Sequence, residues 1–119
     1  MNPTRRVRAR HEWVADLCVR KMATDSFHRT ALQAVLSGLD IDRFVIRGMQ
    51  SDFCVDTTTR RALSLDYPVT LVSDAHTTLD NEVLSADQII RHHNATLGNI
   101  HSFGVKVTLA AARDVAFVR

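Results

Sequence analysis

Cys54 is the side chain in this sequence whose type and position best suit nucleophilic chemistry. It follows a short apolar run that ends at Gly48, and helical spacing begins directly after it. We therefore expect the thiol in the first turn of a helix, which Ser51 or Asp52 is suited to cap. The amide groups and dipole of a helix start favour the thiolate over the thiol. Because a lone cysteine is more often a small buried hydrophobe, position alone leaves the catalytic and the structural interpretation open.

Three histidines, His76, His92 and His93, raise the question of a metal site. Neighbouring residues on a helix point about 100° apart, so His92 and His93 are poorly placed to chelate one ion together. His93 lies on an apolar stripe and is expected to be a hydrogen-bonded packing residue. His76 follows the carboxyl end of a predicted strand, where it either lines a pocket or serves the structure. We predict no metal ligands.

The elements that position these residues include three helices, predicted from the periodicity of apolar residues. They cover residues 32–39, a stretch that begins at residue 55, and residues 86–100. The first and third are preceded by sequences typical of a capping box, namely Thr30 with Gln33 and Ser85 with Gln88.

Short apolar runs predict the strands. Strands buried on both faces are predicted at residues 43–47 and 69–72. An edge strand is predicted at residues 104–109, where apolar and polar residues alternate, and a weaker extended segment at residues 13–19. The alternation of helix and strand predicts an α/β fold with a parallel sheet and right-handed crossovers. Such sheets place their chemistry at the carboxyl ends of the strands.

Length and composition indicate one domain. A chain of 119 residues with 45% hydrophobic and 24% charged residues resembles average globular chains and is too short for two ordinary domains. We expect residues 1–119 to form this single domain, with a basic arm at 1–12 and a folded part at 13–119. The net charge of +2 and the lack of a basic face with stacking aromatics argue against a nucleic-acid partner.

The sequence also suggests where the protein works. No apolar run approaches the roughly 18 residues of a membrane span, and the first ten residues lack the apolar stretch of a signal peptide. Cys18 and Cys54 have no C-x-x-C spacing, so neither a disulfide framework nor a structural zinc site is indicated. Free thiols fit a reducing compartment. We expect a cytoplasmic protein with no membrane partner.

Several segments, in order, resemble the isochorismatase-like cysteine hydrolases, a superfamily that includes nicotinamidases, N-carbamoyl amide hydrolases and isochorismatases. The resemblance extends from Lys21 to about Val107. Its motifs are K-x-x-x-x-x-F-x-x-T-x-L from Lys21, G-M-Q-S-D-F-C-V-D-T-T from Gly48, R-A-L from Arg61, S-D-A-H-T-T from Ser73 and I-I-R-H-H-N-A-T-L from Ile89. It implies a three-layer α/β/α fold of the Rossmann-like type, hydrolysis of small amide, carbamoyl or ester-like substrates, and no cofactor.

The resemblance also implies catalytic roles. Cys54 is implied to be the nucleophile that attacks a carbonyl carbon, and Lys21 to hold the charge state of the site. The peptide bond between Met49 and Gln50 is implied to be cis, with the amides of Gln50 and Cys54 facing the oxyanion.

Other implied roles lie around the thiol. Phe27 and His76 are possible pocket residues. Asp74 is implied to be structural, fixing loop amides beside the site rather than taking part in the chemistry.

The sequence departs from the family pattern upstream of Lys21. The family's general base is an aspartate in a D-x-Q or D-x-N pattern, and neither pattern occurs in the 119 residues. We therefore expect a partial domain that lacks the first strands and, with them, the base, with only Asp52 and Asp74 as possible substitutes. An open strand edge favours self-association into a homo-oligomer. The alternative to an active hydrolase is a catalytically impaired remnant that acts only as an assembly partner.

Overall fold

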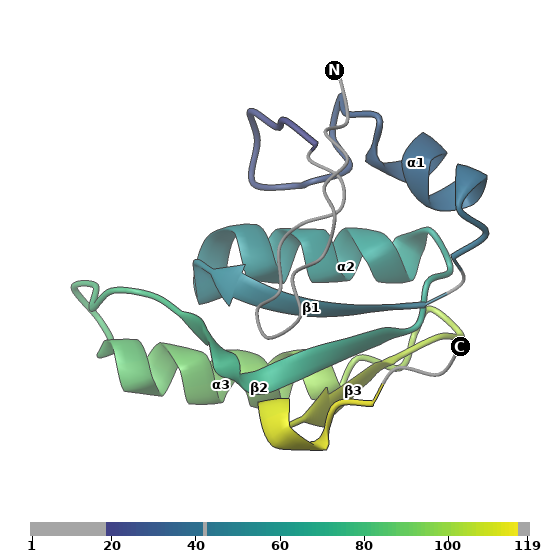
Figure 1. Cartoon of the computed structure of the whole chain (residues 1–119). Coiled ribbons are helices and arrows are strands. Elements are labelled where there is room, and N and C mark those ends of the chain that lie inside the picture. Colours follow the sequence, from purple (N-terminus) through teal and green to yellow (C-terminus); the bar gives the residue numbers. More distant parts are fainter. Residues whose placement is uncertain (1–18, 42, 117–119) are drawn as a thin grey trace.

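The computed structural model describes residues 19–41 and 43–116 of the chain, and Figure 1 shows the arrangement of their elements. In chain order these are α1 (Leu32–Gly38), β1 (Phe44–Met49), η1 (Ser51–Val55), α2 (Asp56–Ser64), β2 (Val69–Thr77), α3 (Ala86–Gly98), β3 (Val107–Ala110) and η2 (Ala112–Asp114). The predicted alternation of helix and strand is confirmed. The basic arm and all but the last residue of the extended candidate at 13–19 lie outside the described residues.

The three strands form one parallel sheet in the order β1-β2-β3, which confirms the predicted α/β architecture. The expectation that residues 43–47 are buried on both faces is wrong, because the apolar residues of β1 are only half-buried. Among the described residues β1 is an edge strand with a neighbour on one side only. β2 is the central strand, and β3 occupies the edge position predicted for it.

Helices α2 and α3 form a helical layer on one face of the sheet. Consecutive strands joined by right-handed crossovers place both helices on the same side, and Asp56 of α2 lies 3.9 Å from His93 of α3. In Figure 1 α2 runs along β1, and α3 runs along β2. The hydrophobic core cluster contains Phe27, Val55, Ala62, Leu63, Val69, Leu71, Leu97 and Val107. The longest of the described helices, α3, has 13 residues, and none of them could cross a membrane.

The two predicted capping boxes have different outcomes. At α3 both bonds of the box are present: the Ser85 hydroxyl accepts from the Gln88 amide at 3.2 Å, and the Gln88 side chain accepts from the Ser85 amide at 3.0 Å. At α1 the predicted box is wrong, because Ala31 occupies the cap position and no side chain caps the helix. The Thr30 hydroxyl instead donates to the Ser26 carbonyl at 2.6 Å, which closes the preceding turn.

A change of register between β1 and β2 shapes the carboxyl end of the sheet. Ile46 pairs with Leu71, but Gly48 pairs with His76, so the offset between partners rises from 25 to 28 residues. β2 therefore has three more residues than β1 across this irregularity. Gly48 absorbs the resulting bend with a φ of +127°, a conformation that favours glycine. The register change brings the last residues of β1 beside His76.

The conformation of Gly48 predicts a specific cost for a side chain at this position. Gly48→Ala is expected to lower the free energy of unfolding by about 1–3 kcal/mol, because residues with a Cβ rarely adopt a positive φ of this kind. Gly38→Ala is the matched control, since an added Cβ meets no atom within 4 Å at either position. In helix α1 the alanine is expected to be neutral or to stabilise by about 0.4–1 kcal/mol. Urea unfolding measures both, and equal effects would contradict the assignment.

Candidate active site

Cys54 lies in η1, a single π-helical turn between β1 and α2. The carbonyl of Gln50 closes this turn by accepting from the amides of Phe53 at 3.1 Å and Val55 at 3.0 Å. The thiol therefore precedes the α-helix rather than sitting in its first turn. The expectation that Ser51 or Asp52 caps this helix is also wrong, because Val55 occupies the cap position of α2 and Gln50 that of η1, both without a side-chain bond.

Ser51 and Asp52 instead attach η1 to the end of β2 and the residue that follows it. The Ser51 hydroxyl lies 2.7 Å from Nδ1 of His76, and Oδ1 of Asp52 accepts from the Thr78 hydroxyl at 2.6 Å. These partners are distant in the sequence, and local capping rules do not anticipate them. Ser51 and Asp52 make these bonds instead of capping a helix, because β2 and the residue after it bring His76 and Thr78 alongside η1.

The Ser51 contact belongs to a buried chain of hydrogen bonds. Nε2 of His76 lies 2.8 Å from Oδ1 of Asn94, whose Nδ2 donates to the carbonyl of Ser73 at 3.1 Å. Since the nitrogen of Asn94 is committed to a carbonyl, its oxygen must accept from Nε2–H of His76. Nδ1 of His76 is then free to accept from the Ser51 hydroxyl. The imidazole thus holds η1, β2 and α3 together.

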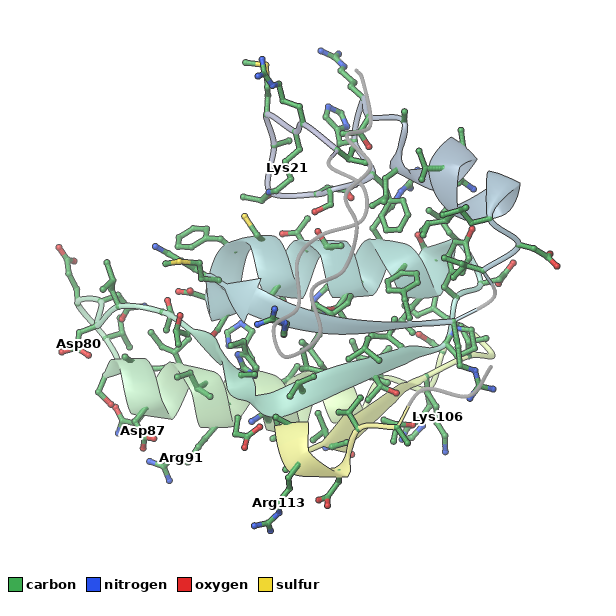
Figure 2. The ribbon with its side chains drawn as sticks, viewed as in Figure 1. Lys21, Asp80, Asp87, Arg91, Lys106 and Arg113 are labelled. Atoms are coloured by element: carbon green, nitrogen blue, oxygen red, sulfur yellow. The ribbon has the colours of Figure 1, made fainter. Side chains whose placement is uncertain are left out.

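Lys21 is the polar partner of the thiol. Its Nζ donates to Sγ of Cys54 at 3.1 Å and to the carbonyl of Ala23 at 2.9 Å. Lys21 is exposed on the segment that precedes α1 (Figure 2), whereas Cys54 is half-buried. An ammonium group at this distance stabilises a thiolate electrostatically, and one of its three N–H groups remains for a further acceptor. The geometry is suited to an activated sulfur nucleophile.

The peptide bond between Met49 and Gln50 is cis, as the resemblance implies. It joins the end of β1 to η1, so the Gln50 amide and the Cys54 amide lie at opposite ends of one short turn. Met49 is 60% exposed, which places this junction at the surface of the described part of the chain.

The structure places both predicted pocket residues in the packed interior. Phe27 is 8% exposed, and its ring stacks on Tyr67 with centroids 6.3 Å apart. His76 is 2% exposed and held in the hydrogen-bonded chain described above. Asp74 binds a backbone amide, but that amide opens η2 rather than lying in a loop: its Oδ1 accepts from Ala112 at 2.8 Å. His93 is a packing residue, with Nδ1 donating to the Ile89 carbonyl at 2.8 Å.

Sequence reasoning missed Asn94 and Thr58. Asn94 lies four residues after Ile90 and three before Leu97, so its place on the buried stripe of α3 was a usable signal. Thr58 lies three residues after Val55 and four before Ala62, so its place on the apolar stripe was visible as well, but its partners 32 and 34 residues away were not. Within residues 19–41 and 43–116, no cluster of three or more His, Cys, Asp or Glu side chains is arranged to hold a metal ion.

Comparison with known proteins gives a consistent family. Residues 4–111 match the isochorismatase domain family. A streptothricin hydrolase from Streptomyces noursei is 40% identical over 62 residues, which are 52% of this chain and 22% of that protein. The crystal structure of an isochorismatase from Pseudomonas putida KT2440 superposes with a TM-score of 0.75 at 26% identity, covering 82% of this chain and 50% of that one.

A second solved structure is similar over much the same share of the chain. A cysteine hydrolase from Pseudomonas syringae pv. phaseolicola superposes with a TM-score of 0.68 at 28% identity, over 79% of this chain and 45% of that one. The chain therefore spans about half the length of these solved relatives.

The brace through His76 predicts a stability effect. His76→Ala is expected to lower the free energy of unfolding by at least about 1–3 kcal/mol, because the Ser51 hydroxyl and the Asn94 oxygen lose a buried partner. His101→Ala is the matched control, since His101 is exposed just after α3. Thermal or urea unfolding compares the two variants. A loss for His76→Ala no larger than for His101→Ala would show that the buried chain does not brace the turn.

Proposed function

This chain belongs to the isochorismatase family, and we propose that it is a cysteine hydrolase of small amide, carbamoyl or ester-like substrates with Cys54 as the nucleophile. The observation that carries the proposal is the 3.1 Å contact between Nζ of Lys21 and Sγ of Cys54. A cation at that distance raises the thiolate fraction, and the thiolate is the nucleophilic form of cysteine. The printed name of the Pseudomonas syringae relative, a cysteine hydrolase, supports the same chemistry.

The first half of the reaction forms a thioester. The Cys54 thiolate attacks the carbonyl carbon, the C–S bond forms, and the carbonyl electron pair moves onto oxygen. The amides of Gln50 and Cys54 are the proposed donors to this oxyanion. The oxyanion then collapses, the bond to the leaving amine or alcohol breaks, and the Lys21 ammonium supplies the proton that the leaving group needs.

The second half returns the enzyme to its starting state. Water attacks the thioester carbon and loses its proton to solvent, the thiolate leaves with the electron pair of the C–S bond, and Lys21 regains its proton from solvent. Asp52 and Asp74 are weak candidates for this proton transfer, because the Thr78 hydroxyl and the Ala112 amide already engage them. A positioned general base contributes typically 10²- to 10⁴-fold, so we expect slow hydrolysis of the thioester.

Assembly and location complete the proposal. β1 has one paired neighbour among the described residues, and Met49 and Phe53 beside it are more than half exposed. An open strand edge of this kind favours association with a second copy of the chain. The free thiol of Cys54 suits the reducing cytoplasm.

The role of the ammonium predicts selective labelling of one cysteine. Iodoacetamide in limiting amount at neutral pH is expected to modify Cys54 well ahead of Cys18, as read by peptide mass spectrometry. Lys21→Met is expected to slow modification of Cys54 about fivefold, since an exposed ion pair is worth up to about 1 kcal/mol. Lys106→Met is the control, because Lys106 lies on the opposite side of the molecule (Figure 2). Equal labelling of the two cysteines, or equal effects of the two lysine variants, would contradict the proposal.

The division into two half-reactions predicts an accumulating intermediate. With p-nitrophenyl acetate, intact-mass spectrometry is expected to show one acetyl group on the protein, formed faster than it is hydrolysed. Cys54→Ala is expected to abolish both the adduct and turnover of a panel of simple amides and esters, whereas Cys18→Ala is expected to retain them. Turnover that survives in Cys54→Ala would refute the nucleophile. Fast turnover without an adduct would refute the slow second half.

A further inference from the structure

The segment that carries Lys21 has no regular secondary structure to hold it. Residues 22–31 form bends and turns, residues 19–21 have no regular structure, and the contact of Lys21 with the Ala23 carbonyl lies within the segment itself. That contact orders the side chain but does not fix the segment against the rest of the protein. A long exposed lysine loses considerable rotamer freedom when it is held against one acceptor. Something else must set the position of this segment relative to Cys54.

Phe27 fixes the far end of the segment but not the part near the lysine. Its buried ring lies against Phe44 and Tyr67, so residue 27 is anchored in the core. Asp25 adds little, because its carboxylate lies 3.8 Å from the half-exposed Arg61 guanidinium, a weak surface contact. Five residues still separate Phe27 from Lys21.

Thr58 contacts the segment inside that gap. Its hydroxyl accepts from the Ser26 amide at 2.9 Å, donates to the Thr24 carbonyl at 3.2 Å and lies 3.0 Å from the Ser26 hydroxyl. Thr58 is 8% exposed, so water competes little for these bonds. The buried Thr58 hydroxyl thus contacts three polar atoms of the segment that follows Lys21.

Thr58 lies on the same side of the helical segment as Cys54, one turn further along the chain. Thr58 follows Cys54 by four residues across the junction of η1 and α2, which puts the two side chains about one helical turn apart on one side. Thr24 follows Lys21 by three residues. The contacts of Lys21 with Cys54 and of Thr24 with Thr58 therefore run side by side, and the second fixes the spacing of the first.

We infer that Thr58 is a positioning residue, whose hydroxyl holds the segment after Lys21 so that the ammonium stays against Sγ of Cys54. The inference rests on the proposed function, because it assigns Thr58 a role in preparing the thiolate. Without the hydroxyl the segment remains attached at Phe27, but the ammonium no longer has a fixed place beside the sulfur. Loss of the hydroxyl then acts on the thiol through Lys21.

The adjacent residue provides a matched control. Thr59 is also in α2 and fully buried, but its hydroxyl has no hydrogen-bond partner among the described residues. Thr59→Val therefore makes the same chemical change one position along the helix without breaking a bond. Thr58→Ser keeps a hydroxyl at the position under test, and Thr58→Ala removes it without placing a methyl group against the Ser26 amide.

The experiment measures the rate of iodoacetamide labelling of Cys54 against pH by peptide mass spectrometry, in the full chain. Thr58→Val and Thr58→Ala are expected to slow labelling at neutral pH about fivefold, as Lys21→Met does, and to move the midpoint of the profile to higher pH. Thr58→Ser and Thr59→Val are expected to retain the parent profile. Adding Lys21→Met to Thr58→Ala is expected to cause no further slowing, because both changes remove one interaction.

A purely structural role would lower the melting temperature without moving this profile, and that result would overturn the inference. Additive slowing in the double variant would also overturn it, and so would a profile in Thr59→Val that moves as far as in Thr58→Val. If Thr58→Val does not fold, Thr58→Ala decides the matter. Because labelling needs no substrate, loss of hydrolysis with the expected labelling pattern would sink only the proposed function. Cys54-dependent hydrolysis with an unmoved Thr58→Ala profile would sink only the inference.

Discussion

The site depends on the pairing of β1 with the second half of β2. If the register set by Ile46 and Leu71 continued unchanged, His76 would lie beyond the end of β1. The three extra residues in β2 instead bring His76 beside Gly48, at the point where the chain turns into η1. From there the imidazole reaches both Ser51 and Asn94. The geometry of the nucleophile thus follows from an irregularity in strand pairing, with Gly48 allowing the bend.

The two partners of the proposed ion pair are held with unequal strength. The turn that carries Cys54 is fixed by buried bonds from Ser51 and a cluster of core residues, whereas Lys21 lies on an exposed segment without helix or strand. Regions with few buried contacts open locally at a lower free energy than the core does. Changes near Lys21 are therefore expected to alter the state of the thiol before they alter the fold. The ionisation of the thiol can therefore change while the free energy of unfolding stays the same.

Local sequence rules were sufficient where the interactions are local. The capping box at Ser85 involves partners three residues apart, and it is present as predicted. The cap expected from Ser51 failed because a histidine 25 residues away competes for the same hydroxyl. The apolar run of β1 predicts more burial than the structure has, because the burial of a strand also depends on the strands beside it and β1 has one such neighbour among the described residues. The cis bond after Met49 came from the family resemblance and not from any local rule.

The half-burial of β1 and the lack of a D-x-Q or D-x-N pattern in the 119 residues concern the same edge of the described sheet. β1 ends at the cis bond beside Cys54, so a strand that paired with β1 in parallel would end at the same edge of the sheet. Such a strand would bury the exposed side of Phe44 and Ile46 and bring its own last residues close to the thiol. A carboxylate at that end would take the position that Asp52 and Asp74, already hydrogen-bonded elsewhere, do not fill. One parallel strand on the side of β1 that has no neighbour among the described residues would therefore serve both the burial of β1 and the proton transfer.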